Sequence, residues 1–247
     1  LENYPLFFSD KFELISQLII SLFQSNKCLL VEAGARTASL FLGFYGKDID
    51  FSIHFSTVLF DVCKTNSSPD LLSYLSDLLK FTRNESDELF DAVLQFALSV
   101  IASAPLEFKS SAFSILSTLS TLSKIHVITR FNIVFSFLME IINSTNEIST
   151  VLRPDAIDVL TDWFCQAEQN EILNFISMCV SFLSTMDPMV VASCIRAMSK
   201  IISLHQSQEL VELIGPILPF IEHQAGTNIT KIEKQNIVNS IDMNKEG

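Results

Sequence analysis

The spacing of apolar side chains constrains this chain more than any other feature of its sequence. Apolar residues recur every three or four positions, which places them on one face of an α-helix. No comparable stretch alternates as a strand would, and four stripes are clear: Phe12–Phe23, Phe90–Ile101, Val134–Ile142 and Val190–Ile202. Hydrophobic residues make up 49% of the 247 residues and charged residues only 18%, which supplies a core and argues against disorder. The pattern therefore predicts an all-α fold.

Start signals divide these stripes into about eleven helices. Pro69, Pro105, Pro154 and Pro188 each stand where a helix would begin, a position at which proline loses no intrahelical hydrogen bond. The expected helices are 10–24, 27–43, 48–64, 69–82, 87–103, 105–123, 125–143, 154–167, 171–185, 188–204 and 207–222. The short connections between them make neighbouring helices antiparallel.

The four prolines also indicate a repeat, because they open every second expected helix. A two-helix period of about 35 to 50 residues is typical of solenoids, in which each pair stacks on the next to bury its apolar face. We therefore expect an α-α superhelix of about five to six antiparallel helix pairs over residues 1–225. Residues 226–247 are polar and are expected to form a tail or linker.

Several of these helices resemble a known repeat. Asp187–Met198 looks like the second helix of a HEAT repeat, and the helices beginning at Pro105 and Pro154 are similar. Leu213–Pro219 resembles the proline-containing first helix of such repeats. Arg196 stands one turn later than a strict HEAT pattern requires. The resemblance, over residues 10–222, is thus to the HEAT/armadillo-like superfamily.

Within that superfamily the irregular, acidic repeats look most like nuclear transport receptors of the importin and exportin (karyopherin-β-like) type. That resemblance implies a concave face, lined by the second helices, that grips cargo or a small GTPase. Two other functions stay open. One is a static HEAT scaffold subunit of a phosphatase, vesicle-coat or chromosome complex. The other is a helical lipid-binding or enzyme-accessory domain, whose signature would be an enclosed apolar cavity.

Charge and composition limit the partners. A net charge of −12 argues against direct nucleic-acid binding and favours basic protein segments. Mean hydropathy is +0.38, but the longest uncharged runs end before the roughly 20 residues that a membrane-spanning helix needs, so we expect no membrane span. The five cysteines lie far apart without zinc-ligand spacing, and we expect buried thiols in a reducing cytoplasmic or nuclear compartment.

No motif for catalysis stands out. The chain lacks the common phosphate-binding, zinc-protease and nucleophile-elbow sequences. Its four histidines are dispersed, so a metal cluster would need three distant helices to converge. We expect a protein that is not an enzyme and has no cofactor.

Two groups of residues are candidates for protein binding. The densest acidic cluster is either a solvated helix start or a landing surface for a basic peptide, and it contains Glu85, Asp87, Glu88 and Asp91. The single tryptophan, Trp163, is either core or an exposed anchor of the kind found at binding hot spots. If its indole were exposed, Asp162 and Glu168 could hold a Lys or Arg stacked on the ring.

Overall fold

The structure, a computed structural model, describes residues 11–45, 49–82, 87–165, 169–184 and 187–205, together with Glu212 and Gly215. Every regular element in these ranges is a helix, which confirms the all-α prediction for this part of the chain. The expected helix 207–222 and the tail 226–247 lie outside the described residues. The chain divides into two compact units, residues 1–126 and 127–247. Continuous stacking across that division stays a prediction.

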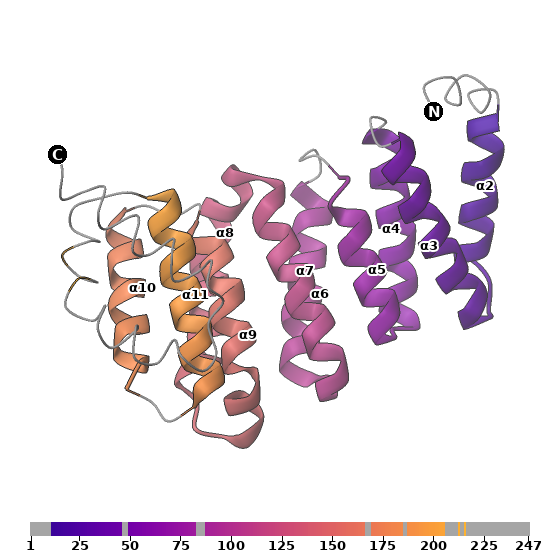
Figure 1. Ribbon diagram of the computed structural model, residues 1–247. Coiled ribbons are helices and arrows are strands. Elements are labelled where there is room, and N and C mark those ends of the chain that lie inside the picture. The colour runs from indigo at the N-terminus through magenta and orange to yellow at the C-terminus, as the bar shows by residue number, and fades with distance from the viewer. Residues whose placement is uncertain are drawn as a thin grey trace. The chain divides into compact units, whose positions relative to one another are not determined.

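Unit 1 contains three successive helix pairs (Figure 1). They are α2 (Phe12–Phe23) with α3 (Cys28–Tyr45), α4 (Ile49–Thr65) with α5 (Pro69–Leu79), and α6 (Asp87–Ser103) with α7 (Leu106–Leu122). Each first helix packs against the second helix that follows it, and the second helix α5 also packs against α3 and α7. Leu72, Leu75 and Leu116 are fully buried in this way. Each pair therefore covers its apolar face with the next pair, because two helices alone cannot.

Small hydroxyl side chains join the second helices α5 and α7. Ser73 Oγ lies 3.1 Å from Ser111 Oγ, and Ser76 Oγ lies 2.8 Å from Thr118 Oγ1. The Ser76 hydroxyl also donates to the carbonyl oxygen of Ser114. The contacts join residues 38 and 42 positions apart and advance in the same direction along both helices, so α5 and α7 run parallel. Serine and threonine are short enough to let the two helices approach closely.

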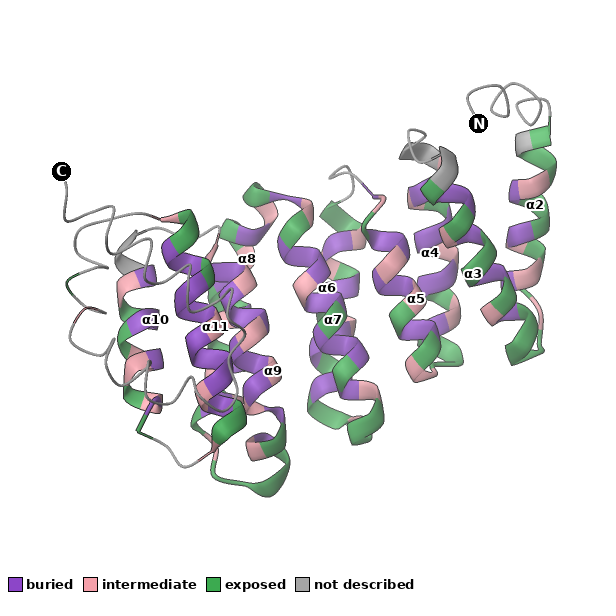
Figure 2. Ribbon diagram, in the orientation of Figure 1, coloured by how far each residue is buried: buried purple, intermediate pink, exposed green. Residues whose placement is uncertain are grey.

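Unit 2 shows the same relation between its second helices. Its helices are α8 (Lys124–Asn143), whose first turn belongs to unit 1, α9 (Glu147–Phe164), α10 (Gln169–Phe182) and α11 (Pro188–Leu204). Buried residues run along most of α9 and α11 (Figure 2), which pack side by side. Asp158 pairs with Arg196 at 2.7 Å and Asp162 pairs with Lys200, and both pairs join residues 38 positions apart. The helices α9 and α11 are therefore parallel as well.

Two of the predicted helix starts are confirmed in detail. Pro69 opens α5, and the Ser68 side chain caps that helix by accepting a hydrogen bond from Leu71 N at 3.1 Å. Pro188 opens α11 after Asp187, whose carboxylate accepts from the amide of Met189 at 2.9 Å. Proline in the first turn and an oxygen-bearing cap together satisfy the amides that a helix start leaves unpaired.

The predicted start at Pro154 is wrong. Helix α9 begins at Glu147, where the Asn146 side chain accepts a hydrogen bond from Ser149 N at 2.6 Å, and Pro154 lies buried inside the helix. An interior proline sacrifices one backbone hydrogen bond. Arg153 holds this turn in place, because its guanidinium donates to the carbonyl oxygens of Ile142 at 2.8 Å and Ser144 at 2.7 Å, at the end of α8. The Asn146 cap and the Arg153 hydrogen bonds therefore stabilise a helix that starts before Pro154.

The cysteine prediction holds for three of the five residues. All five are free thiols, and Cys63, Cys179 and Cys194 are buried. Burial raises the pKa of Cys63 to about 12, which keeps that thiol protonated and unreactive. Cys165 is half-buried and Cys28 is exposed in the first turn of α3, contrary to the expectation of burial.

Candidate functional site

The acidic cluster at the start of α6 is partly engaged by the chain itself. Asp87 and Glu88 are exposed, Asp91 is half-buried, and Glu85 lies outside the described residues. The Asp87 carboxylate contacts His126 Nε2, and the His126 ring lies 5.0 Å from the ring of Phe90. The structure thus places Asp87 in a contact between helix ends, which fits the helix-start interpretation. Glu88 keeps an exposed carboxylate that a basic segment could reach.

Trp163 is fully buried in α9, in agreement with the core interpretation. Asp162 is half-buried, and its carboxylate pairs with the Lys200 ammonium of α11. Glu168 lies outside the described residues. The exposed indole with flanking acids is therefore not formed: the tryptophan belongs to the packing between helices, and Asp162 already holds a cation from its own chain.

A row of charges runs along α9 and α11 beside Asp162. Arg196 joins Asp158 to the Ser193 hydroxyl, at 2.7 Å from each. Burial raises the pKa of Asp155, the negative charge of Asp158 raises it further, and Arg196 opposes the rise. Burial lowers the pKa of Lys200, but the hydrogen bond with Asp162 and the nearby negative charges, that of Asp162 first, together raise it by more. The acidic side chains of α9 therefore pair mainly with the basic side chains of α11.

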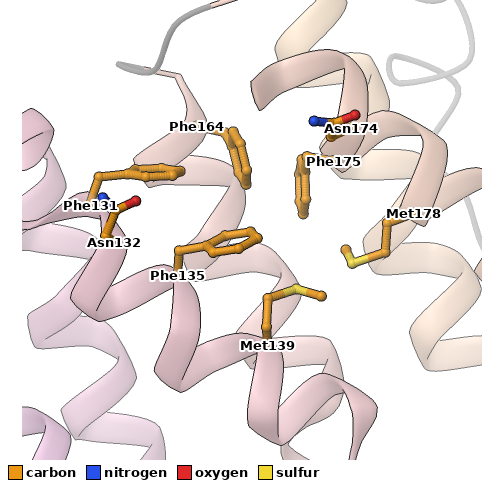
Figure 3. Close-up of a pocket in the computed structure, with 8 residues that line it drawn as sticks. All are labelled: Phe131, Asn132, Phe135, Met139, Phe164, Asn174, Phe175 and Met178. Atoms are coloured by element: carbon orange, nitrogen blue, oxygen red, sulfur yellow. The ribbon is translucent and has the colours of Figure 1, made fainter. Parts of the chain in front are cut away.

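The described surface holds an apolar pocket in unit 2, of about 210 Å³ (Figure 3). Three helices supply its lining. Helix α8 contributes Phe131, Asn132, Phe135 and Met139, helix α9 contributes Phe164, and helix α10 contributes Asn174, Phe175 and Met178. The pocket thus lies between α8 and α10, the first helices of two successive pairs. The C-terminal end of α9, the second helix of the first pair, closes one part of it.

Aromatic rings form the walls of this pocket. Phe164 and Phe175 stack with their centroids 4.3 Å apart and their planes within 13°. Phe131 and Phe135 both meet Phe164 edge to face, at 5.0 and 5.9 Å. Such pairs fix one another's orientation and add to the stability gained from burial. The walls are therefore ordered by their own packing before any ligand arrives.

The rim of the pocket is polar and uncharged. Asn132 and Asn174 are exposed, whereas Phe131, Phe164 and Phe175 are buried. Met139 and Met178 are half-buried and point toward one another from α8 and α10 (Figure 3). Among the described residues, the lining contains no ionisable side chain and no nucleophile. Its chemistry is that of a binding site for an apolar group, with two amides able to donate and accept hydrogen bonds at the edge.

The apolar stripes did not predict this pocket, because a phenylalanine at helical spacing is expected in the core. One sequence signal of uncovered apolar surface does exist in α8, because its apolar side chains occupy more than one face of the helix. Ile128 and Ile133 are exposed at 50% and 49%, and Phe137 and Ile141 are only half-buried. An amphipathic surface helix would place polar residues at such positions. The excess marks a helix that leaves apolar surface uncovered.

Helix α8 is also long and apolar enough to span a bilayer by length and composition, and 28% of its most apolar window is buried. Arg130 and Glu140 interrupt its apolar surface. Such a match is weak support for a membrane span, because core helices of soluble proteins pass the same test. Among the described residues no group of three or more His, Cys, Asp or Glu side chains is placed to hold a metal ion.

No protein-family model and no curated protein matches this sequence. Two crystal structures of engineered proteins are similar in fold. The first shares 14% sequence identity at a TM-score of 0.53, over 93% of this chain and 96% of that chain. The second shares 15% identity at a TM-score of 0.52, over 92% of this chain and 58% of that chain. At this identity the likeness concerns the helical fold alone.

Proposed function

We propose that this chain is a protein-binding helical-repeat scaffold with a HEAT-like superhelix. In its most specific form it is a segment of a nucleocytoplasmic transport receptor that binds cargo or a small GTPase. The observation that carries the proposal is the aromatic pocket of unit 2, which lies between successive helix pairs and whose described lining residues carry no reactive group. Hot spots of protein interfaces are pockets of this kind, filled by one anchoring side chain.

The arrangement of the second helices supports the repeat part of the proposal. The second helices α5 and α7, and likewise α9 and α11, are parallel neighbours, and contacts between them join residues 38 positions apart. Units that repeat by translation touch only their neighbours and build extended surfaces, which suits proteins that bind other proteins along their length.

The size of the pocket argues against a lipid-handling domain. Pockets for drug-sized ligands have volumes of roughly 300 to 1,000 Å³. The pocket here has about 210 Å³, which suits one inserted side chain better than an acyl chain.

A pull-down with the intact chain distinguishes the transport-receptor hypothesis from the static-scaffold and lipid-binding hypotheses. The immobilised chain is incubated with cytosolic and nuclear extract, and the nuclear-transport GTPase is added in its GTP form, added in its GDP form, or omitted. Partner recovery that changes only with the GTP form supports the transport receptor. Partners recovered equally in all three arms support the static scaffold and overturn the transport reading. Recovery of lipid and no protein overturns the scaffold proposal itself.

A further inference from the structure

The first helix pair of unit 1 has an exposed apolar face. On α2, Leu14 and Leu18 lie one turn apart, and on α3 one stripe contains Leu29, Ala33 and Leu40, which lie four and eleven positions apart. All five side chains are exposed, the four leucines by 58% to 78%. Contiguous apolar surface of this kind marks an interaction site.

This face points away from the next helix pair. On α3, the buried side chains Val31, Ala35 and Leu42 lie on the opposite side of the helix from the exposed stripe, and α3 packs against α5. On α2, the buried ring of Phe23 meets Phe55 of α4 edge to face, at 6.4 Å. The second pair therefore covers one side of the first pair (Figure 1), and the exposed leucines lie on the other.

We infer that the outer face of α2 and α3 binds an amphipathic helix of a partner protein, with an apolar stripe bordered by acidic side chains. The inference goes beyond the proposed function, because it concerns a second surface and does not depend on a transport role. An amphipathic helix places residues three and four positions apart against such a surface. Ala33 is small and lies between Leu29 and Leu40, which lets the incoming helix approach α3 closely.

The charges of the first pair favour an acidic helix. Residues 11–45 carry three basic and two acidic side chains, a net charge of +1, in a chain whose net charge is −12. The basic side chains are Lys11, Lys27 and Arg36, and all three are exposed. None of them takes part in the ion pairs of the described residues. Because charges are screened beyond about 8 Å at physiological ionic strength, these nearby cations decide the local preference.

Charge also argues against the other occupants of an apolar face. A second copy would bring these three cations against their own equivalents across a symmetric interface, which like-charge repulsion opposes. An anionic bilayer is wider than one helix pair and would also meet the acidic remainder of the chain. A single acidic helix meets mainly the cations of the first pair, so it is the occupant that the charges favour.

Fluorescence anisotropy with the intact chain tests this inference. The labelled probe is the amidated peptide Glu-Leu-Glu-Gln-Leu-Leu-Gln-Glu-Leu-Glu-Gln-Leu-Leu-Gln-Glu, in which glutamates border one leucine face. The same peptide with lysine at every glutamate should bind about two- to tenfold more weakly, the combined contribution of a few exposed ion pairs. The difference should shrink as salt rises from about 0.1 M to about 1 M. No binding of the glutamate peptide, or equal affinity of the two peptides at low salt, overturns the inference.

A pair of leucine substitutions with a matched control locates the site. Leu18→Ser with Leu29→Ser removes one leucine from each helix and should weaken the glutamate peptide by at least about tenfold, the loss expected at a hot spot. Leu106→Ser with Leu204→Ser makes the same change at exposed leucines of α7 and α11 and should have no effect. All four positions are exposed, so each variant should fold, which circular dichroism melts verify. An equal loss in both variants would place the peptide elsewhere and overturn the inference.

Charge reversal tests the acidic character of the partner. Lys27→Glu with Arg36→Glu leaves residues 11–45 with one basic and four acidic side chains, and the lysine peptide should then bind more tightly than the glutamate peptide. Lys64→Glu with Lys80→Glu changes the charge of unit 1 by the same amount at exposed positions of α4 and at the end of α5, and should leave the order of the peptides unchanged. An unchanged order in the first variant would contradict the acidic assignment.

Three outcomes would assign the face to another occupant and overturn the inference. One is a dimer of the intact chain, seen by sedimentation velocity, that Leu18→Ser with Leu29→Ser abolishes. Another is binding to phosphatidylserine vesicles that the same variant loses, where the glutamate peptide does not bind. The third is a glutamate peptide that binds only after residues 1–8 are deleted, because the chain's own N-terminal residues would then compete for the face.

The inference and the proposed function can fail separately. If the glutamate peptide does not bind but the pull-down still recovers protein partners, the acidic helix is wrong and the scaffold function stands. If the peptide binds as expected and the pull-down recovers no partner in any arm, the docking face stands and the proposed function is wrong.

Discussion

Gly34 allows a close contact between α3 and α2 in unit 1. A Cβ atom added there would lie 2.9 Å from Leu22 Cβ and 3.2 Å from a ring carbon of Phe23, both on α2. The first of these atoms is fixed to the backbone and cannot swing away. The glycine therefore sets how closely α3 approaches α2.

Gly34→Ala should destabilise the chain. Overpacking costs about 1 to 3 kcal/mol, and the better helix propensity of alanine returns only about 1 kcal/mol, so we expect a net loss of about 1 kcal/mol. Gly43→Ala in the same helix is the matched control, because a Cβ there meets nothing within 4 Å and alanine should stabilise by about 0.5 to 1 kcal/mol. Urea unfolding measures both. Two changes of the same sign would contradict the account.

Asp155 makes stability depend on pH. Its pKa is raised above the ordinary value of 3.8, first by burial and then by Asp158, so the folded state disfavours the charged carboxylate. The folded state tolerates the neutral carboxyl group better than the charged one. The stability that Asp155 contributes is therefore fully present below pH 3.8 and is lost as the pH rises through the raised pKa. Asp155→Asn should therefore raise the melting temperature at pH 7 and leave it unchanged near pH 3. A gain of equal size at both values would rule out titration as its cause.

At the scale of the helix, Ile195 tests whether α11 is placed with the right face inward. Its side chain is fully buried, and Ile195→Asp would leave a charge without a partner among apolar neighbours. We expect a loss of about 4 kcal/mol in the free energy of unfolding. Met189→Asp, at an exposed position of the same helix, should stay within about 0.5 kcal/mol. A thermal melt unaffected by Ile195→Asp would contradict the assignment of the buried face.

The period of the apolar residues predicts the helices well because burial is what forms them. Helix α11 was predicted over the residues it occupies, since Asp187, Pro188 and the stripe from Val190 to Ile202 all agree. Helix α9 was misplaced at its start because two signals compete there. The Asn146 cap is a local signal and the Arg153 contacts with the end of α8 are tertiary, and a proline rule weighs neither.

The candidate site was less predictable than the fold. Periodicity shows which residues lie on one face of a helix, but it does not show whether that face is fully covered. Phe131 and Phe175 look like core residues in sequence, and both are buried, yet they also line an opening. Trp163, which the sequence leaves open between the core and an exposed anchor, is fully buried in the core. Only the relative placement of three helices reveals the pocket.

At the scale of the whole molecule, the net charge of −12 predicts how salt affects binding. Raising ionic strength from about 0.1 M to about 1 M shortens the screening length from about 10 Å to about 3 Å. A basic cargo peptide should therefore bind more weakly at high salt. The same peptide with its lysines replaced by glutamines should lose little, because it has no positive charges left for salt to screen. Titration calorimetry measures the affinity of both peptides. Equal affinity of the basic peptide at low and high salt would contradict a role for electrostatic attraction.

The central claim is that successive helix pairs repeat by translation, so that second helices are parallel neighbours in fixed register. Ser73→Cys with Ser111→Cys tests it directly, because the two hydroxyl oxygens lie 3.1 Å apart and belong to α5 and α7. Ser73→Cys with Ser110→Cys is the control, since Ser110 is exposed on another face of α7. Mild oxidation followed by tryptic mass spectrometry reads out the bond, and the peptides 65–80 and 110–124 contain no native cysteine. The account predicts a disulfide-linked peptide pair for Ser111 and little for Ser110; equal linkage of the two, or none for Ser111, would contradict it.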